Sequence, residues 1–98
     1  MNPHLRAIGA KLRDNLPLLR QNYHVKNLEL FGSYVRGQQK KRSDLDILIE
    51  FSRPIDLFTF VELKHFLSEL LGVKVDLVMK ETLKPRIREK ILREAVSL

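Results

Sequence analysis

The sequence contains no cysteine and no tryptophan, and it has only four glycines and four prolines among its 98 residues. Without cysteine, neither a disulfide framework nor a thiolate metal site is possible. Arg6, Lys11 and Arg13 interrupt the apolar residues near the N-terminus, so the chain lacks the continuous apolar stretch of a signal peptide. No apolar run approaches the roughly 20 residues that span a bilayer. We therefore expect a cytoplasmic protein.

The chain is basic, with 18 Lys and Arg residues against 12 Asp and Glu residues and a net charge of +6. Its 44% hydrophobic content and its spread-out charge argue against disorder. A chain of this length can form one modest core and has no room for a second. We predict a single domain over residues 1–98, and the three histidines show no metal-ligand spacing.

The residue patterns along the chain predict the element order α-β-α-β-α-β-α. Three segments are rich in β-branched and aliphatic residues, as strands are, at residues 25–31, 44–51 and 73–79. Helical patterns and turn residues place four helices at residues 2–17, 34–36, 56–71 and 82–95. Polar residues on one face of the strands suggest that helices cover only the other face. The predicted fold is α+β, a small mixed sheet with helices on one face.

Four residues are expected to mark the ends of these helices. Asn2 is expected to cap the first helix, and Pro17 to bend or end it. Gly72 is expected to end the third helix and Thr82 to cap the fourth.

The third helix carries more apolar residues than a single core-facing stripe needs. On a helical wheel, Leu57, Phe58 and Val61 fall outside the arc of its core residues. One interpretation is an exposed contact surface near the basic last helix, which docks a helical partner or a second copy of the chain. The other is that the helix starts later and these residues pack from a loop.

Two aspartates alternate along the second strand. Residues two apart in a strand project from the same face, so Asp44 and Asp46 aim at one point. Their charges repel unless a cation lies between them. Magnesium is bound in this way, by one or two carboxylates together with substrate phosphates. We therefore predict a site for a divalent cation.

Ten residues separate a glycine-serine turn from the first of these aspartates. Backbone N–H groups at the start of the short helix after it can hold phosphate. Gly32 lets a phosphate approach closely, and the Ser33 hydroxyl can donate to it. Asp76 is a third acid, in the third strand, and three carboxylates converge if the strands are neighbours. Two metals held there could clamp the two oxygens of an in-line displacement at phosphorus.

The segments Phe31-Gly32-Ser33, Asp44-Leu45-Asp46-Ile47 and Val75-Asp76-Leu77 resemble the signature of the DNA polymerase beta-like nucleotidyltransferases. The patterns Gly32-Ser33-x-x-Arg36-Gly37 and Ser43-Asp44-x-Asp46 resemble the minimal nucleotidyltransferase branch. The resemblance implies a palm-like fold, a nucleoside triphosphate substrate such as ATP, two Mg²⁺ ions, and transfer of a nucleoside monophosphate to a hydroxyl acceptor with release of pyrophosphate.

The resemblance also implies roles for individual residues. Gly32 and Ser33 hold the triphosphate, while Asp44 and Asp46 bind both metals. Asp76 ligates the catalytic metal and helps to deprotonate the acceptor hydroxyl. Two roles stay open for Arg36, which either reaches a phosphate or pairs with an aspartate to hold the loop. Neither role makes Arg36 catalytic.

The resemblance suggests a protein as the acceptor. Minimal nucleotidyltransferases commonly accompany a small helical HEPN protein as a toxin–antitoxin pair, and members of the family can attach AMP to a partner tyrosine. Larger relatives that modify aminoglycosides use an additional domain, which this chain lacks. Two other functions stay open: a catalytically silent partner-binding module, and a basic module that binds nucleic acid. The basic segment 40–42 is either a solvated loop or a patch that steers triphosphate or an acidic partner.

Overall fold

The computed structural model describes residues 3–97, which form a small α+β fold with a four-stranded mixed sheet in the order β3-β2-β1-β4. Strand β1 pairs antiparallel with β2 and with β4, and β2 pairs parallel to β3. Within residues 3–97, no helix is long and apolar enough to cross a membrane. The elements are α1 (Pro3–Tyr23), β1 (Val25–Phe31), α2 (Ser33–Arg36), β2 (Leu45–Phe51), α3 (Leu57–Leu71), β3 (Val75–Met79), the short 3₁₀ helix η1 (Lys80–Thr82), α4 (Pro85–Glu94) and β4 (Val96–Ser97).

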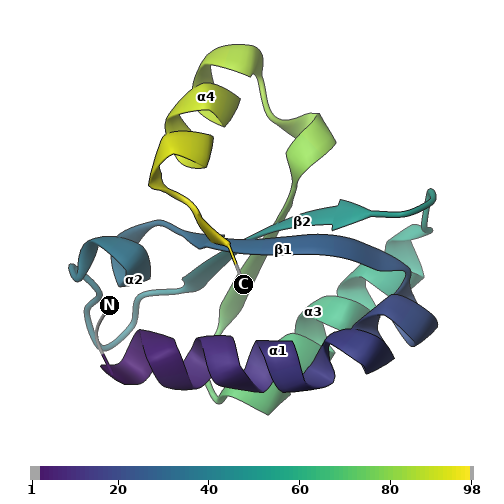
Figure 1. Cartoon of the computed structure of the whole chain (residues 1–98), viewed down its shortest axis with the longest axis horizontal. Helices are drawn as coiled ribbons and strands as arrows, with labels where there is room; N and C mark the ends of the chain where they lie inside the picture. The colour runs from purple at the N-terminus through teal and green to yellow at the C-terminus, as the bar shows by residue number, and fades with distance from the viewer. Residues whose placement is uncertain (1–2, 98) are drawn as a thin grey trace.

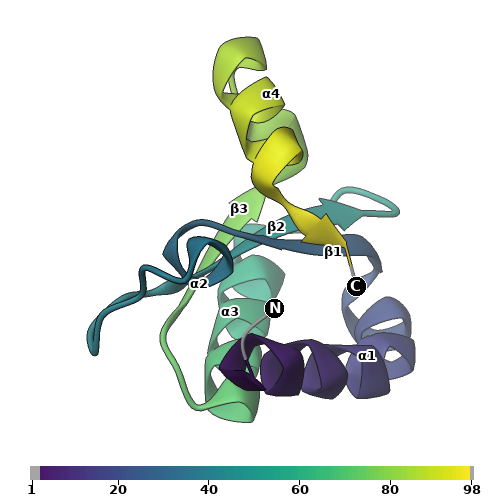
Figure 2. The same ribbon diagram turned by 60° about the vertical axis from the view of Figure 1, so that its left-hand side comes forward.

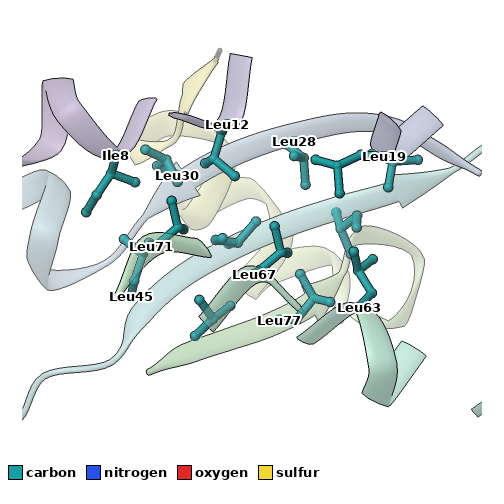
Figure 3. Close-up of a cluster of buried hydrophobic side chains, with 14 of the residues drawn as sticks. Ile8, Leu12, Leu19, Leu28, Leu30, Leu45, Leu63, Leu67, Leu71 and Leu77 are labelled. Carbon is teal, nitrogen blue, oxygen red and sulfur yellow. The ribbon is translucent and has the colours of Figure 1, made fainter. Parts of the chain in front are cut away.

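The sheet has a packed face and a second, more open face. Helices α1 and α3 lie together against one face, whereas α4 stands on the other side (Figures 1 and 2). The core fills the space between α1, α3 and the sheet, and most of its side chains are leucines (Figure 3). Because side chains alternate along a strand, Leu45, Ile47 and Ile49 are buried in this core and Asp46 faces the other side. The predicted fold class is confirmed.

The open face is partly covered. Phe31 and Leu48 lie on the same face as Asp46 and are buried, although they are not part of the main core cluster. The segment on this side is α4, which leads into β4 at the edge of the sheet (Figure 2). None of the ten residues of α4, all of which the structure describes, is buried. The helix therefore borders the face that carries the aspartates without forming a core of its own.

The first helix is longer than predicted, because α1 continues through Pro17 to Tyr23. Proline lacks the N–H that would donate to the preceding turn, which makes a helix unfavourable at that point. Beyond it, however, Leu19 is fully buried, and the ring of Tyr23 packs beside that of Phe66 in α3. Tertiary packing thus outweighs the local preference. The predicted cap, Asn2, lies outside the described residues.

The third helix ends where Gly72 predicts, and it begins one residue after the predicted start at Asp56. The side chain of Asp56 accepts a hydrogen bond from the Thr59 N–H and caps α3. At the other end Gly72 has a φ of 69° and its N–H donates to the Ser68 carbonyl. The interpretation in which the helix starts later is wrong, because Leu57 is its first residue.

The C-terminal part differs from the prediction in two ways. The Thr82 hydroxyl donates to the Met79 carbonyl inside η1 and does not cap α4. Helix α4 begins instead at Pro85, a position where a missing N–H costs nothing. The two-residue strand β4 was not predicted, because such a short strand has no periodic pattern to recognise. Its residues Val96 and Ser97 pair with β1.

The apolar first turn of α3 is exposed but is not near the last helix. Leu57, Phe58 and Val61 are all exposed, as the wheel predicts. Helix α3 lies on the packed face of the sheet and α4 on the opposite side (Figure 1). The prediction that the first turn of α3 lies near α4 is therefore wrong. After β3, η1 and α4 leave toward the side of the sheet that α3 does not cover (Figure 2).

Candidate active site

The glycine-serine turn lies directly against the carboxylate of Asp46. Strand β1 ends at Phe31, and Gly32 follows with φ 82° and ψ −157°, a conformation that favours glycine. A Cβ atom placed on Gly32 would lie 2.0 Å from Oδ2 of Asp46. No other residue type fits this position without displacing the carboxylate. The close contact brings the two halves of the sequence motif together.

The sheet register brings two of the three predicted aspartates level with each other. Phe31 of β1 is paired with Asp46 of β2, which is paired in turn with Asp76 of β3. All three side chains share the open face, since paired residues on neighbouring strands point the same way. Asp46 is half-buried, whereas Asp76 is exposed. Asp44 lies just before β2 and is partly exposed.

The aspartates interact electrostatically. Burial, the charges of Asp76 and Asp44 and a hydrogen bond to Asp76 together raise the pKa of Asp46 to about 6, with burial the largest cause. The charge of Arg36 acts in the opposite direction and lowers it. A carboxyl group with such a pKa has an unfavourable environment for its negative charge. The site therefore favours a bound cation.

The aspartates suit magnesium, but they do not form a complete metal cage. Within the part of the chain that the structure describes, no group of three or more acidic, histidine or cysteine side chains is arranged to hold a metal ion. The convergence of three carboxylates is thus looser than the sequence predicted. Magnesium is commonly held by one or two carboxylates plus substrate phosphates, and the register places two carboxylates, those of Asp46 and Asp76, side by side.

Glu94, the last residue of α4, contacts the same turn. Its carboxylate accepts a hydrogen bond from the Gly32 N–H at 3.3 Å and one from the Arg36 guanidinium at 2.5 Å. Nε of Arg36 also donates to the Gln38 side chain at 3.0 Å. Among residues 3–97, Arg36 forms its ion pair with Glu94 and not with an aspartate. The aspartate-pairing role predicted for Arg36 is wrong, and its phosphate role stays a prediction.

Sequence reasoning missed Glu94 because 62 residues separate it from Gly32 and no motif connects them. One local signal was present. The C-terminal end of a helix carries the negative end of its dipole, so an acidic residue there is unfavourable unless it has a partner elsewhere. Glu94 occupies the last position of α4 and finds such a partner in Arg36.

The basic loop lies beside the site. The Lys40 N–H donates to the Ser43 hydroxyl, and the Ser43 N–H donates to the Lys40 carbonyl, which gives the loop a defined turn. Lys41 and Arg42 are exposed and line a hollow that also includes Asp44. Their exposure agrees with a solvated loop, and their position next to Asp44 leaves the steering role as a prediction.

Comparisons with known proteins agree with this geometry. The family described as nucleotidyltransferase domain matches residues 12–98. The protein adenylyltransferase MntA of Thermococcus cleftensis is 49% identical over 92 residues, which cover 94% of this chain and 93% of that protein.

Solved structures show the same fold. A structure assigned to the minimal nucleotidyltransferases is 38% identical, with a TM-score of 0.82, and covers 96% of this chain and 95% of that one. A chain from the crystal structure of a toxin–antitoxin with AMP-PNP is 27% identical, with a TM-score of 0.69, and covers 98% of this chain and 72% of that one. Since sequence and fold agree over nearly the whole length, the chain is a nucleotidyltransferase and belongs to the minimal branch of the nucleotidyltransferase domain family.

Proposed function

We propose that this protein is a magnesium-dependent protein adenylyltransferase, which transfers AMP from ATP to a hydroxyl group on a small helical partner of the HEPN type. It acts in the cytoplasm, where ATP is available, as the antitoxin of a toxin–antitoxin pair. The contact between the Gly32 backbone and the Asp46 carboxylate carries the proposal, because it joins a phosphate-binding turn to a metal-binding acid. The activity named for the Thermococcus relative and the toxin–antitoxin complex with AMP-PNP support it.

In this proposal the two halves of the site have different tasks. Gly32 and Ser33 donate hydrogen bonds to the triphosphate, and the Arg36 guanidinium adds a positive charge. Asp44, Asp46 and Asp76 hold two magnesium ions. Bound magnesium supplies the positive charge that lets an anionic triphosphate approach these carboxylates.

The reaction exchanges one phosphorus–oxygen bond for another. The acceptor hydroxyl oxygen bonds to the α-phosphorus of ATP, the bond from that phosphorus to the oxygen of the β-phosphate breaks, and pyrophosphate leaves. The hydroxyl proton needs a base at this moment. Asp76 is the best candidate, because it is exposed and β3 is an edge strand of the sheet. An acceptor as large as a folded protein can reach such a position.

Labelled ATP tests the proposal. The protein is incubated with magnesium, a small helical protein of the HEPN type, and ATP labelled at either the α- or the γ-phosphorus. We expect the α-label to appear on the partner protein and the γ-label to remain off it. Asp46→Asn is the matched control and should give no labelled partner. Transfer of the γ-label would indicate a kinase, and binding of AMP-PNP without any transfer would favour the catalytically silent module.

A further inference from the structure

Two hydrogen-bond donors that the proposed function assigns to the triphosphate are occupied by an acid of the same chain. The Gly32 N–H donates to Oε2 of Glu94, and Nη1 of Arg36 donates to Oε1 of Glu94. The Glu94 carboxylate thus bridges the Gly32 turn and the Arg36 guanidinium, with one oxygen on each. A carboxylate and a phosphate present similar anionic oxygens to such donors. Glu94 therefore stands where a phosphate group of the nucleotide would bind.

Glu94 and a triphosphate cannot share the Gly32 N–H, because one N–H forms one good hydrogen bond at a time. The Arg36 guanidinium has further N–H donors, but two anions side by side on it repel each other. The repulsion is stronger here because Asp46, another anion, also lies against Gly32. Binding of a triphosphate through Gly32 and Arg36 therefore requires Glu94 to leave.

The attachment of α4 permits such a movement. No residue of α4 is itself buried, and Glu94 can leave the turn by rotating its side chain while the helix stays over Phe31 and Leu48. The helix is fixed mainly near its two ends. At its end, β4 forms two residue pairs with β1, while in its first turns Arg88 donates to the Lys80 carbonyl. The side chain of Glu94 itself is 23% exposed and can rotate toward solvent.

We propose that Glu94 is a residue of the nucleotide site that sets its affinity: its carboxylate occupies the phosphate position on Gly32 and Arg36, and the triphosphate must displace it. This inference rests on the proposed function, because it assumes that these donors bind nucleotide. Each binding event then includes the loss of two internal hydrogen bonds to Glu94, so the measured affinity is lower than the donors alone would give.

The test is the affinity of Glu94→Gln for AMP-PNP with magnesium, measured by calorimetry. The amide is neutral and accepts hydrogen bonds more weakly, so we expect this variant to bind about tenfold more tightly than the wild type. Glu89→Gln is the matched control. It makes the same charge change on the same helix, where Glu89 pairs with Arg93, and should change the affinity much less. This control separates competition at the donors from a general gain of positive charge.

The outcomes are distinct. If Glu94→Gln bound AMP-PNP equally or more weakly while the wild type bound it, Glu94 would serve only to position Arg36, and the inference would be overturned. If neither protein bound AMP-PNP, the proposed function itself would fail and the inference with it. Should Glu94→Gln fold poorly, Glu94→Asp keeps the charge but is one methylene shorter. It reaches the donors less well and should also bind more tightly.

Discussion

Asp46 is the residue at which the parts of the site meet, since the Gly32 backbone, Asp44 and Asp76 all lie near its carboxylate. Its pKa rises from 3.8 in the free amino acid side chain to about 6 in the folded protein. Between these two values the folded chain binds more protons than the unfolded chain. The contribution of Asp46 therefore lowers the stability of the ligand-free protein as the pH rises through this window.

We expect Asp46→Asn to raise the melting temperature of the ligand-free protein at neutral pH, because the variant removes a charge from a crowded site. The gain should shrink as the pH falls from about 6 toward about 4, because the carboxyl of the folded wild type is then protonated and uncharged. Thermal unfolding followed by circular dichroism over a pH series checks this. The gain should be modest, because much of the carboxyl is solvated. A gain that did not change with pH would contradict the assigned pKa.

Gly32 differs from the other glycines in the space available for a Cβ atom. Gly32→Ala should destabilise the protein by at least about 2 kcal/mol, because the new Cβ would meet the Asp46 carboxylate in a backbone conformation open only to glycine. Gly37→Ala is the control: Gly37 also has a positive φ, of 71°, but a Cβ there would meet no atom within 4 Å. It should cost only about 1 kcal/mol. Urea unfolding measures both, and equal losses would rule out the clash.

At the scale of the elements, α3 offers two leucines in opposite environments. Leu57 is 73% exposed in the first turn, whereas Leu63 is fully buried against the sheet. Leu63→Ala should lower the free energy of unfolding by about 3 kcal/mol through the lost contacts and the cavity left behind. Leu57→Ala should change it by less than about 0.5 kcal/mol, as is usual for surface sites. A large loss for Leu57→Ala in urea unfolding would place the first turn of α3 in the core.

The same helices and strands show which structural features can be predicted from the sequence. The bounds of β1 and α3 could be predicted because their signals are local: a run of strand-forming residues, and a cap at Asp56 with a glycine at Gly72. The continuation of α1 past Pro17 could not be predicted, because it depends on where Leu19 and Tyr23 pack in the finished fold. Local preference is a weak guide wherever tertiary contacts decide.

The site divides in the same way. A spaced sequence motif predicts four residues of the site: Gly32, Asp44, Asp46 and Asp76. The structure brings Gly32, Asp46 and Asp76 to one face. The position of Glu94 could not be predicted from the sequence, because it follows from the path of η1, α4 and β4 around the sheet. Pairing between distant segments leaves no periodic trace in the sequence.

For the whole molecule, a ligand that binds only the folded state raises its stability. Magnesium with AMP-PNP should therefore raise the melting temperature. At a hundredfold excess of ligand over Kd, the free energy of unfolding should increase by about 2.7 kcal/mol. Magnesium alone should do less, since the described residues supply no complete set of metal ligands. Differential scanning fluorimetry measures both effects. An unchanged melting temperature at millimolar nucleotide would count against the assigned site.

The effect should also depend on pH. Protonation of Asp46, whose pKa is about 6, removes a ligand charge, so the shift caused by magnesium with AMP-PNP should shrink between about pH 7.5 and about pH 5. Asp46→Asn should show a small shift throughout this range. A shift in the wild type that stayed constant over the range would separate Asp46 from metal binding.

The parallel pairing of β2 with β3 has a consequence for folding. Asp46 meets Gly32 through the antiparallel pair of β1 and β2, which are close in the chain, but it meets Asp76 only after α3 has crossed over and β3 has docked. Contacts between distant segments form late, because closing the longer loop costs more entropy. A chain still emerging from the ribosome would thus hold the turn and its first acid before it holds the second. Substrate that needs both acids would therefore bind only the molecules in which β3 has docked beside β2.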